Sequence, residues 1–368
     1  MNIIHLVRAT TWGGGERYAL DLCRRSVETG DNVTVITRGV PFIDEKFARA
    51  GATIKRMPLG GIFDLTSPIR IARMVREMKG EPVIFHVHTF KDAEIVTKAK
   101  KIIGKRGNVK LVCTRHLVKP GKSSFRWKKI YAGIDSLIFI SNLAKETFLE
   151  SNPPVTLDRL AVVHNSVAVP KKYSVPMPPP SSQTLNILFT GRISPEKGID
   201  VLIESIGKLS DIPLRLQIAG TGKPEYVKQL QDLATLHHIT DRIEWIGFAE
   251  DVYEKIVKAD ICVAPSVWAE PFGLTIIEFM SQARPVITTD NGAQKEIITD
   301  GVEGFLVGPS DPDAIASAIR KLSSDKNLRE KMGEKAFRTF RSRFAYDIFF
   351  NRIRDIYKSV GQQYQYLK

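Results

Sequence analysis

Short apolar runs alternate with longer amphipathic stretches along the first half of the chain. The apolar runs have the length of β-strands, and we expect strands at Asn2–Val7, Asn32–Thr37, Pro82–His86, Val109–Thr114, Ser136–Ile140 and Leu160–Val163. Helical periodicity lies between them, for example at Glu16–Glu28, Ser67–Met78 and Asn142–Glu150. Because strands buried on both faces read as continuous apolar runs, this alternation predicts a parallel sheet covered by helices.

The same alternation restarts after residues 170–184, which are rich in Pro and Ser and are expected to be a linker. Strands are predicted at Asn186–Thr190, Leu214–Ala219, Arg242–Ile246, Ile261–Ala264, Pro285–Thr288 and Gly304–Val307. Helices are predicted at Ile199–Leu209, Pro224–His237, Pro312–Leu322, Asn327–Phe340 and Tyr346–Tyr357. The pattern therefore predicts two doubly wound α/β domains, residues 1–169 and 185–344, with ligands bound in a cleft between the carboxyl ends of their strands.

Length and composition agree with this organisation. A chain of 368 residues favours two domains, and no apolar run approaches the ~18 residues needed to span a bilayer. The N-terminal apolar run is too short for a signal peptide, so we expect a cytoplasmic protein. Cys23, Cys113 and Cys262 are far apart in sequence, which favours buried free thiols over a disulfide or a metal site.

The net charge of +14 is concentrated in the first half of the chain. Residues 1–170 contain 28 Lys and Arg against 15 Asp and Glu, whereas residues 171–368 contain 26 against 25. This asymmetry suggests that the first half meets an anion, such as a nucleic acid, an anionic lipid or a phosphate-bearing acceptor. Ordinary solvated surface accounts for many of these charges but explains the asymmetry poorly.

Glycine-rich turns follow strands in both halves. Gly13 and Gly14 come directly after the first predicted strand, and Gly220 and Gly222 follow a strand of the second domain. Glycine allows close approach of the backbone to a ligand, and helix N–H groups can bind an anion. Either loop is equally compatible with a tight turn without a ligand.

The turn Gly191–Gly198 places two cations at the end of the first strand of the second domain. Arg192 offers a planar fork of donors and Lys197 a compact charge, and the pair suits a diphosphate. The alternative is a turn with solvated charges. We favour phosphate binding because the turn lies where ligands bind such sheets.

Two glutamates, Glu270 and Glu278, flank the predicted start of another helix near Gly273. A carboxylate in the loop can accept hydrogen bonds from sugar hydroxyls, and one further along the helix can hold a ribose diol. The helix start can bind phosphate through backbone amides, those of Gly273, Leu274 and Thr275. Alternatively, Glu270 is a helix cap and Glu278 is a solvated side chain.

These motifs resemble those of retaining glycosyltransferase family 4. Glu270-Pro271-Phe272-Gly273 followed by Glu278 resembles the family's E-x7-E motif. The remaining similarities are the diphosphate-binding turn Gly191-Arg192 with Lys197-Gly198, the N-terminal loop Gly13-Gly14 and the segment Val163-His164-Asn165-Ser166-Val167. The resemblance extends from about residue 2 to about residue 345. His164-Asn165-Ser166 replaces the usual Pro-Asn-Gly, and residues 291–296 differ from the common Gly-Gly-x-x-E, which leaves the donor open.

The resemblance implies a GT-B fold, with the donor on the C-terminal domain, the acceptor mainly on the N-terminal one, and a final helix, 345–368, packed back on the first domain. It implies hexosyl transfer with retention by same-face attack. No cofactor or metal ion is expected, because Arg192 and Lys197 would stabilise the departing diphosphate.

The resemblance also assigns roles to single residues. Catalytic roles fall to Glu270 and His116, which would reach the sugar, and to Arg192 and Lys197. Donor binding also involves Gly13, Gly14, Gly220, Gly222, Phe272, Gly273, Leu274, Thr275 and Glu278. On the acceptor side we expect His88, Asn165, Lys122 and Arg126. A lone histidine after a strand, such as His116, is as often structural.

The basic segment Lys119–Tyr131 mixes cations with aromatic residues. It suits either an anionic membrane surface or a phosphate-linked acceptor, and its alternative is a solvated basic helix. We therefore expect a nucleotide sugar and a sugar or lipid-linked acceptor as partners, in cell-surface polysaccharide or glycolipid assembly, with the protein peripheral on the inner face of the membrane. The alternatives are a nucleotide-sugar epimerase and a basic nucleic-acid-binding protein. The second is disfavoured because no nucleic-acid motif is present.

Overall fold

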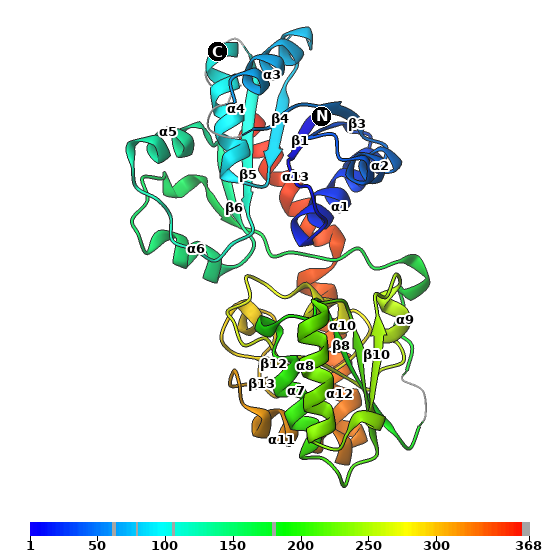
Figure 1. Ribbon diagram of the computed structural model, residues 1–368. Helices are drawn as coiled ribbons and strands as arrows, with labels where there is room; N and C mark the ends of the chain where they lie inside the picture. The colour runs from blue at the N-terminus through cyan, green and yellow to red at the C-terminus, as the bar shows by residue number, and fades with distance from the viewer. Residues whose placement is uncertain (61–63, 79, 105–106, 179–181, 363–368) are drawn as a thin grey trace. The chain divides into compact units, whose positions relative to one another are not determined.

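The computed structural model describes residues 1–60, 64–78, 80–104, 107–178 and 182–362. Contacts divide the chain into two compact units (Figure 1). The first unit comprises Met1–Asn165 and Asp347–Lys368, and the second comprises Ser166–Tyr346. Each unit contains one parallel β-sheet with helices on both faces, the α/β class predicted from the sequence.

The first sheet has seven strands in the order β3-β2-β1-β4-β5-β6-β7. Their bounds are β1 Asn2–Val7, β2 Asn32–Thr37, β3 Thr53–Arg56, β4 Val83–Val87, β5 Val109–Arg115, β6 Ser136–Phe139 and β7 Leu160–Val162. The direction of winding reverses between β1 and β4, so the carboxyl ends of these two strands mark the position where doubly wound sheets bind ligands. The register pairs His5 of β1 with His86 of β4.

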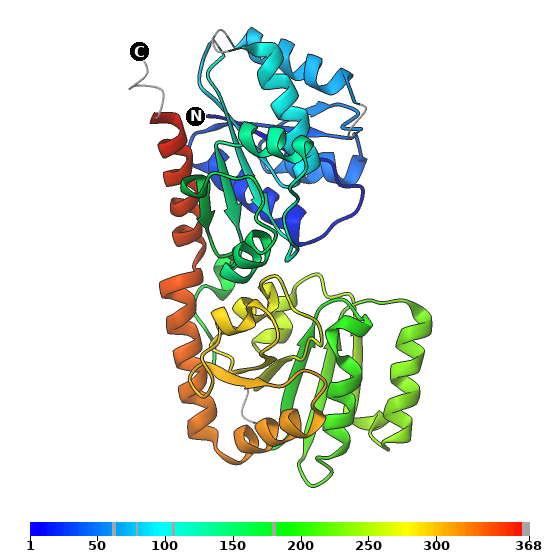
Figure 2. The same cartoon turned by 90° about the vertical axis from the view of Figure 1, so that its left-hand side faces the viewer.

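Helices α1 (Gly14–Glu28) and α2 (Pro41–Arg49) pack on one face of this sheet, and α3 (Thr66–Glu77), α4 (Phe90–Ile103) and α5 (Phe125–Gly133) on the other. Helix α6 (Asn142–Leu149) follows β6. The C-terminal helix α13 (Tyr346–Gln362) lies beside α1 (Figures 1 and 2), where Asp347 accepts a hydrogen bond of 2.8 Å from Arg25. The first unit is therefore completed by a segment far away in sequence.

The second sheet has six strands in the order β10-β9-β8-β11-β12-β13. Their bounds are β8 Leu185–Thr190, β9 Leu214–Ala219, β10 Ile243–Gly247, β11 Ile261–Ala264, β12 Val286–Thr289 and β13 Gly304–Val307. On one face lie α7 (Ile199–Gly207), α8 (Pro224–Leu236) and α11 (Pro312–Ser324), and on the other α9 (Val252–Ile256), α10 (Leu274–Met280) and α12 (Lys326–Thr339). The winding reverses between β8 and β11.

Every strand predicted from the apolar pattern is present, with ends shifted by at most one residue. The pattern failed to predict β3, because this strand lies at an edge of the sheet and its residues Thr53, Lys55 and Arg56 are exposed. Charged side chains on an edge strand discourage pairing with another chain, and they also remove the apolar signal. Cys23, Cys113 and Cys262 are buried free thiols, as predicted.

The segment expected as a linker is packed on the second unit over its first residues. Lys171–Tyr173 forms a 3-10 turn, and the buried Tyr173 donates a hydrogen bond of 2.9 Å to Asp251. The Tyr173 carbonyl accepts another of 3.0 Å from Gln282. Pro and Ser composition did not reveal this anchor, to which Lys172 adds a hydrogen bond of 2.6 Å to Asp251.

Candidate functional site

Two turns of the second unit lie in backbone contact at the carboxyl ends of β8 and β9. The Gly191 amide donates to the Ala219 carbonyl at 3.0 Å, and Ile193 pairs with Gly222. A Cβ on Gly220 would lie 1.8 Å from the Gly191 carbonyl oxygen, and one on Gly222 would lie 2.2 Å from the Ile193 carbonyl oxygen. Packing alone therefore requires glycine at 220 and 222, whether or not a ligand approaches them.

A third glycine, Gly198, connects this turn to the end of β11. Gly198 has a left-handed backbone with φ of 65°, and a Cβ there would lie 2.1 Å from the Pro265 carbonyl oxygen. The Val267 amide also donates to the Glu196 carbonyl at 3.0 Å. This close approach brings Lys197, from the turn after β8, to the loop that follows β11.

Lys197 forms an ion pair with Glu270 in that loop. The Ser266 hydroxyl donates to the same carboxylate at 2.6 Å, and the side chains of Lys197 and Glu270 are only 18% and 13% exposed. Arg192 differs, since its side chain is 72% exposed and lies 3.7 Å from Glu196. The structure thus brings together two of the predicted residues, Lys197 and Glu270, whereas Arg192 is an exposed cation of the same turn.

The glutamate motif spans the turn into α10. Gly273 is the residue before the helix, with φ of 126°, so Glu270 does not cap the helix. Glu278 is buried at 5% exposure, which rules out the alternative of a solvated side chain. Leu274 and Thr275 are half-buried at the helix start.

Phe272, predicted to bind the donor, is instead a core side chain. It is 2% exposed, and its ring centre lies 5.9 Å from that of Phe344. The loop after β12 also packs here, because the Ala293 amide donates to the Glu270 carbonyl at 3.0 Å. A Cβ on Gly292 would lie 2.5 Å from the Glu270 nitrogen. These contacts fix the backbone from which Glu270 projects.

In the first unit, a cavity of about 280 Å³ lies at the carboxyl ends of β4 and β5. Its lining includes Gly15, Glu16, His88, Thr114, His116 and Leu117. Gly13 and Gly14 are exposed at the start of α1, next to Gly15. The cavity therefore joins two sequence-predicted features, the glycine loop and the histidines after the strands.

Four histidines gather around Tyr18 beside this cavity. The ring centres of Tyr18 and His116 are 4.9 Å apart, those of His86 and His88 are 4.8 Å apart, and those of His5 and His86 are 5.3 Å apart. Burial lowers the pKa of both His5 and His116 to about 4. Burial and the neighbouring histidines lower the pKa of His86 and His88 well below the ordinary value. All four rings are consequently neutral near pH 7.

Neither His5 nor Tyr18 was predicted from the sequence. His5 lies within an apolar strand and reads as a core residue, and only the pairing of β1 with β4 places it opposite His86. Side-chain alternation along the strand places His86 and His88 on the same side, where their rings stack. His86 is committed to the core, since its Nδ1 lies 2.6 Å from the Tyr357 hydroxyl of α13.

The predicted acceptor-side residues have different surroundings. Asn165 is buried, and its Oδ1 accepts no hydrogen bond from any described residue. Arg126 donates to both carboxylate oxygens of Glu94, at 2.5 and 3.4 Å. The Lys122 amine lies 5.2 Å from the Trp127 ring centre. Arg126 is therefore already paired, whereas Lys122 remains at the surface.

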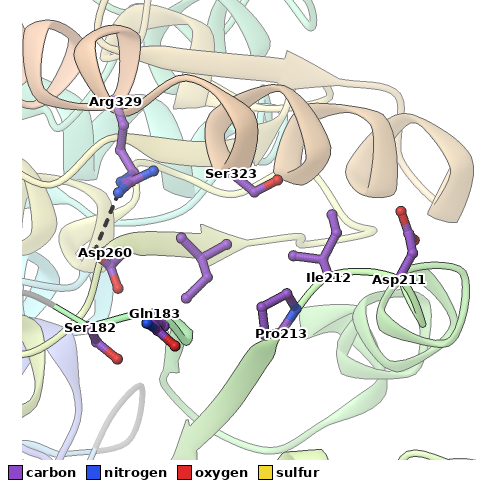
Figure 3. Close-up of a pocket in the computed structure, with 9 residues that line it drawn as sticks. Ser182, Gln183, Asp211, Ile212, Pro213, Asp260, Ser323 and Arg329 are labelled. Carbon is purple, nitrogen blue, oxygen red and sulfur yellow. Dashed lines mark ion pairs between the residues drawn. The ribbon is translucent and has the colours of Figure 1, made fainter.

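Another cavity, of about 310 Å³, lies at the opposite, amino end of the second sheet (Figure 3). Its lining includes Arg329 of α12, which points to Asp260 at 3.9 Å. Parallel α/β sheets bind ligands at the carboxyl ends of their strands, so we assign no function to this cavity.

Within the part of the chain that the structure describes, no group of three or more His, Cys, Asp and Glu side chains is arranged to hold a metal ion, and this includes the four histidines. In the same residues, no helix has the length and apolarity needed to cross a membrane.

Family models match both units. The model of glycosyl transferases group 1 matches residues 178–339, and that of Glycosyltransferase Family 4 matches residues 12–169. Among curated proteins, the uncharacterized glycosyltransferase MJ1607 of Methanocaldococcus jannaschii is 33% identical over 47% of this chain and 44% of its own length. N-acetyl-alpha-D-glucosaminyl L-malate synthase of Bacillus anthracis is 23% identical over 95% of this chain and 94% of its own length. The chain spans about half the length of the first curated relatives it matches, 44% of MJ1607 and 54% of YtcC of Bacillus subtilis.

Solved structures share the fold over nearly the whole chain. A glycosyltransferase from Rickettsia africae has a TM-score of 0.84 at 24% identity, covering 98% of both chains. Anabaena Alr3699/HepE, solved in complex with UDP and glucose, has a TM-score of 0.79 at 18% identity and covers 98% of this chain and 100% of its own. None of these matches is an epimerase or a nucleic-acid-binding protein, so neither alternative gains support. The fold is GT-B, as expected, and the chain belongs to glycosyltransferase family 4.

Proposed function

We propose that the chain transfers a hexosyl group from a nucleotide-diphosphate sugar to an acceptor hydroxyl, with retention of anomeric configuration. The observation that carries the proposal is the cluster of Lys197, Glu270 and Ser266 at the carboxyl ends of β8 and β11. In this cluster the Lys197 amine is paired with the Glu270 carboxylate, at the position where a doubly wound sheet binds ligands.

In this proposal the diphosphate binds between Lys197 and Arg192. The Lys197 amine has three donors, so it can keep Glu270 and still contact a phosphate oxygen. Arg192 is 72% exposed, so its guanidinium can turn towards the second phosphate at little cost in packing. Both cations would stabilise the negative charge that grows on the leaving diphosphate in the transition state.

The two glutamates would bind the other two parts of the donor, the transferred sugar and the ribose. Glu270, held by Lys197 and Ser266, would accept hydrogen bonds from the sugar hydroxyls. Glu278, buried one to two turns into α10, would accept from the ribose diol, which offers two hydroxyl donors to one carboxylate. We propose uridine as the base, and the support is that one solved relative, Anabaena Alr3699/HepE, was solved in complex with UDP and with UDP-glucose.

The nature of the acceptor is also a proposal. Relatives of the same fold include a lipopolysaccharide outer core galactosyltransferase, which supports a cell-surface polysaccharide or glycolipid. The surface around α5 presents Phe125, 72% exposed, with the Lys129 amine 4.2 Å from its ring centre. Such a surface suits an anionic membrane or a phosphate-linked acceptor. If the protein does not co-sediment with anionic vesicles at physiological salt, this result would contradict binding to a membrane surface.

The first experiment is a thermal-shift panel with UDP, GDP, ADP and CMP, each with and without EDTA. A nucleotide that binds only the folded protein stabilises it by RT ln(1 + [L]/Kd). We expect UDP to raise the melting temperature with or without EDTA. No shift with any nucleotide at millimolar concentration would contradict donor binding. Incubation with UDP-sugars and NMR of the product anomer then tests transfer and retention.

A matched pair of variants localises the nucleotide. Glu278→Gln removes the charge proposed to hold the ribose and should weaken UDP binding by about tenfold. Glu303→Gln changes an equally buried glutamate of the same unit, which accepts from Thr299 and Thr339 at the amino end of β13. Its UDP affinity should match that of the wild type. Equal affinities for Glu278→Gln and Glu303→Gln would contradict the ribose role.

A further inference from the structure

Three histidines of the first unit form a chain that runs from the cavity into the core. His116 Nε2 lies 3.4 Å from His88 Nδ1, and His88 Nε2 lies 3.4 Å from His5 Nδ1. His116 and His88 line the cavity, whereas His5 is fully buried. The far nitrogen of His5, Nε2, has no hydrogen-bond partner among the described residues. This chain of three histidines therefore has an open end, His116 at the cavity, and a closed end, the buried His5 Nε2 without a partner.

The fourth histidine does not branch this chain. His86 Nε2 lies 2.7 Å from the Thr114 hydroxyl and His86 Nδ1 lies 2.6 Å from the Tyr357 hydroxyl. Both of its nitrogens are thus occupied by hydroxyl groups. The connection between His5, His88 and His116 is linear.

Neutral rings constrain where the protons lie. Burial keeps the pKa of His5 and His116 near about 4, and burial with nearby histidines keeps the pKa of His88 well below its ordinary value. A neutral imidazole carries one N–H donor and one lone pair. For both hydrogen bonds to form, all N–H groups must therefore point the same way along the chain.

The closed end of the chain decides the direction. If the donors pointed inward, His5 would carry a proton on Nε2, a buried N–H group with no acceptor. If they point towards the cavity, His5 Nε2 is an unprotonated lone pair. Buried N–H groups without partners are rarer than underused acceptors. The outward direction therefore has the lower free energy.

We propose that His5, acting through His88, positions His116 as a hydrogen-bond donor that presents its Nδ1–H to the cavity. His5 is a positioning residue in this arrangement, because it is fully buried and would not touch the bound group. No described residue forms a hydrogen bond with His116 Nδ1. The bound group must then offer an acceptor oxygen, and a sugar hydroxyl is such a group. The identity of this ligand rests on the proposed function, whereas the tautomer does not.

Nitrogen NMR of the wild-type protein tests the tautomer directly. Histidine-selective ¹⁵N labelling and long-range ¹H–¹⁵N correlations distinguish Nδ1–H from Nε2–H rings, and the signals lost in His116→Asn assign His116. We expect His116 to be protonated at Nδ1 at neutral pH. A His116 ring protonated at Nε2 would overturn the proposal. This result does not depend on whether the protein transfers sugar.

Two substitutions at His5 separate positioning from packing. Asn at position 5 offers an amide N–H in the place of Nδ1–H, whereas Leu fills the space without a donor. We expect His5→Leu to depopulate the Nδ1–H form of His116 and to lower kcat/KM by about tenfold, the equivalent of one hydrogen bond. His5→Asn should retain both properties.

The control is His238→Asn, the same change at an exposed histidine of the second unit whose left-handed backbone suits Asn. It should match the wild type. Equal losses in His5→Leu and His5→Asn with an unchanged His116 tautomer would show that His5 acts through packing alone, and would refute the positioning role. Absence of transfer in every protein, with the expected tautomers, would refute the proposed function and leave the positioning of His116 intact.

Discussion

The two units have the same kind of sheet but opposite chemistry at its carboxyl edge. The second unit presents charges, with Lys197 paired to Glu270 and with Arg192 exposed in the same turn as Lys197. The first unit presents a neutral, largely buried cluster of histidines around Tyr18. The difference lies in which side chains follow the strands, since the backbone arrangement at the reversal of winding is common to both.

This contrast fits two kinds of ligand. A diphosphate carries charge and is best met by cations that can approach it from solvent. Sugar hydroxyls are neutral and are best oriented by fixed donors and acceptors whose charge does not change. On the proposed function, one edge would hold the part of the donor that leaves, and the other would contact the part that is transferred.

The largest expected difference between the units is in their response to acid. The pKa values of His5 and His116 are lowered by burial from 6.5 to about 4. A group with a lowered folded-state pKa stabilises the fold fully above its unfolded pKa, and this stabilisation is lost as the pH falls towards the folded value. For His5 and for His116, the free energy of unfolding should fall by about 2 kcal/mol as the pH falls from 6.5 to about 5. The lowered pKa values of His86 and His88 change the stability in the same direction.

Two carboxylates of the first unit, Asp92 and Asp21, act in the opposite direction, because burial raises the pKa of each. The pKa of Asp92 is raised to about 6, so protonation of Asp92 stabilises the fold as the pH falls through 6. Two carboxylates offset only part of the effect of four histidines. In the second unit, Asp211 and Asp251 have lowered pKa values, the first through its hydrogen bond from Arg320 and the second through those from Lys172 and Tyr173. Their contributions are lost only below about pH 4.

Buried thiols allow each unit to be followed separately. Cys113 lies in the first unit and Cys262 in the second, and both are buried. Urea titrations at about pH 7.5 and pH 5, with pulses of an acid-active disulfide reagent and peptide mapping, report the exposure of each thiol. Between the higher and the lower pH, we expect the free energy of unfolding measured through Cys113 to fall by several kcal/mol. The free energy measured through Cys262 should change little. Parallel shifts of both thiols would contradict the contrast.

The next largest effect concerns the ion pair of the second unit. Lys197→Met removes the held cation, and the loss of one charge that stabilises the transition state should lower kcat by about 10²–10³-fold. It also leaves Glu270 without its cation in a site where only 13% of the side chain is exposed. The double variant Lys197→Met, Glu270→Gln should recover part of the lost stability but none of the activity.

The control for this prediction is Lys228→Met, which breaks an exposed pair with Asp232 on α8. Surface pairs of this kind contribute about 0–1 kcal/mol, so both activity and stability should stay near the wild-type values. Steady-state kinetics and urea unfolding measure both quantities. Wild-type kcat in Lys197→Met would exclude the cation from the reaction.

The sequence predicted the architecture well because its signal is local. Strands buried on both faces, such as β4 and β5, appear as apolar runs with definite ends. The turn residues Arg192 and Lys197 were singled out because their turn follows the first strand of the second domain, where sheets of this kind bind ligands. The motif position of Phe272 did not reveal which way its side chain points, and the structure places this ring in the core.

Long-range pairing accounts for what the sequence did not reveal. His5 and His88 are 83 positions apart, and only the placement of β1 beside β4 brings them together. Tyr357 reaches His86 from the other end of the chain. Lys197 meets Glu270 because Gly198 packs on the Pro265 carbonyl. No pattern of hydrophobic and polar positions contains such contacts.

The smallest expected effects come from the glycines, which sharpen the comparison between the two edges. Gly198→Ala places a Cβ on a left-handed backbone, 2.1 Å from the Pro265 carbonyl oxygen. It should destabilise the second unit by about 2 kcal/mol or more, because the strained backbone and the clash add together. Urea unfolding read through Cys262 measures this loss. An unchanged midpoint would show that the contact between the two turns yields easily.

Gly13 in the first unit has no such structural reason to be glycine. Its backbone is extended, and a Cβ there would lie 3.2 Å from the flexible end of Glu16. Gly13→Ala should therefore change the free energy of unfolding by no more than about 0.5 kcal/mol. If the donor approaches this loop, as the resemblance implies, the methyl group should still raise the KM for the donor, because it occupies space that only the bound ligand uses. Wild-type stability and wild-type KM together would show that no ligand contacts Gly13, and the first unit's part in donor binding would then be limited to its cavity.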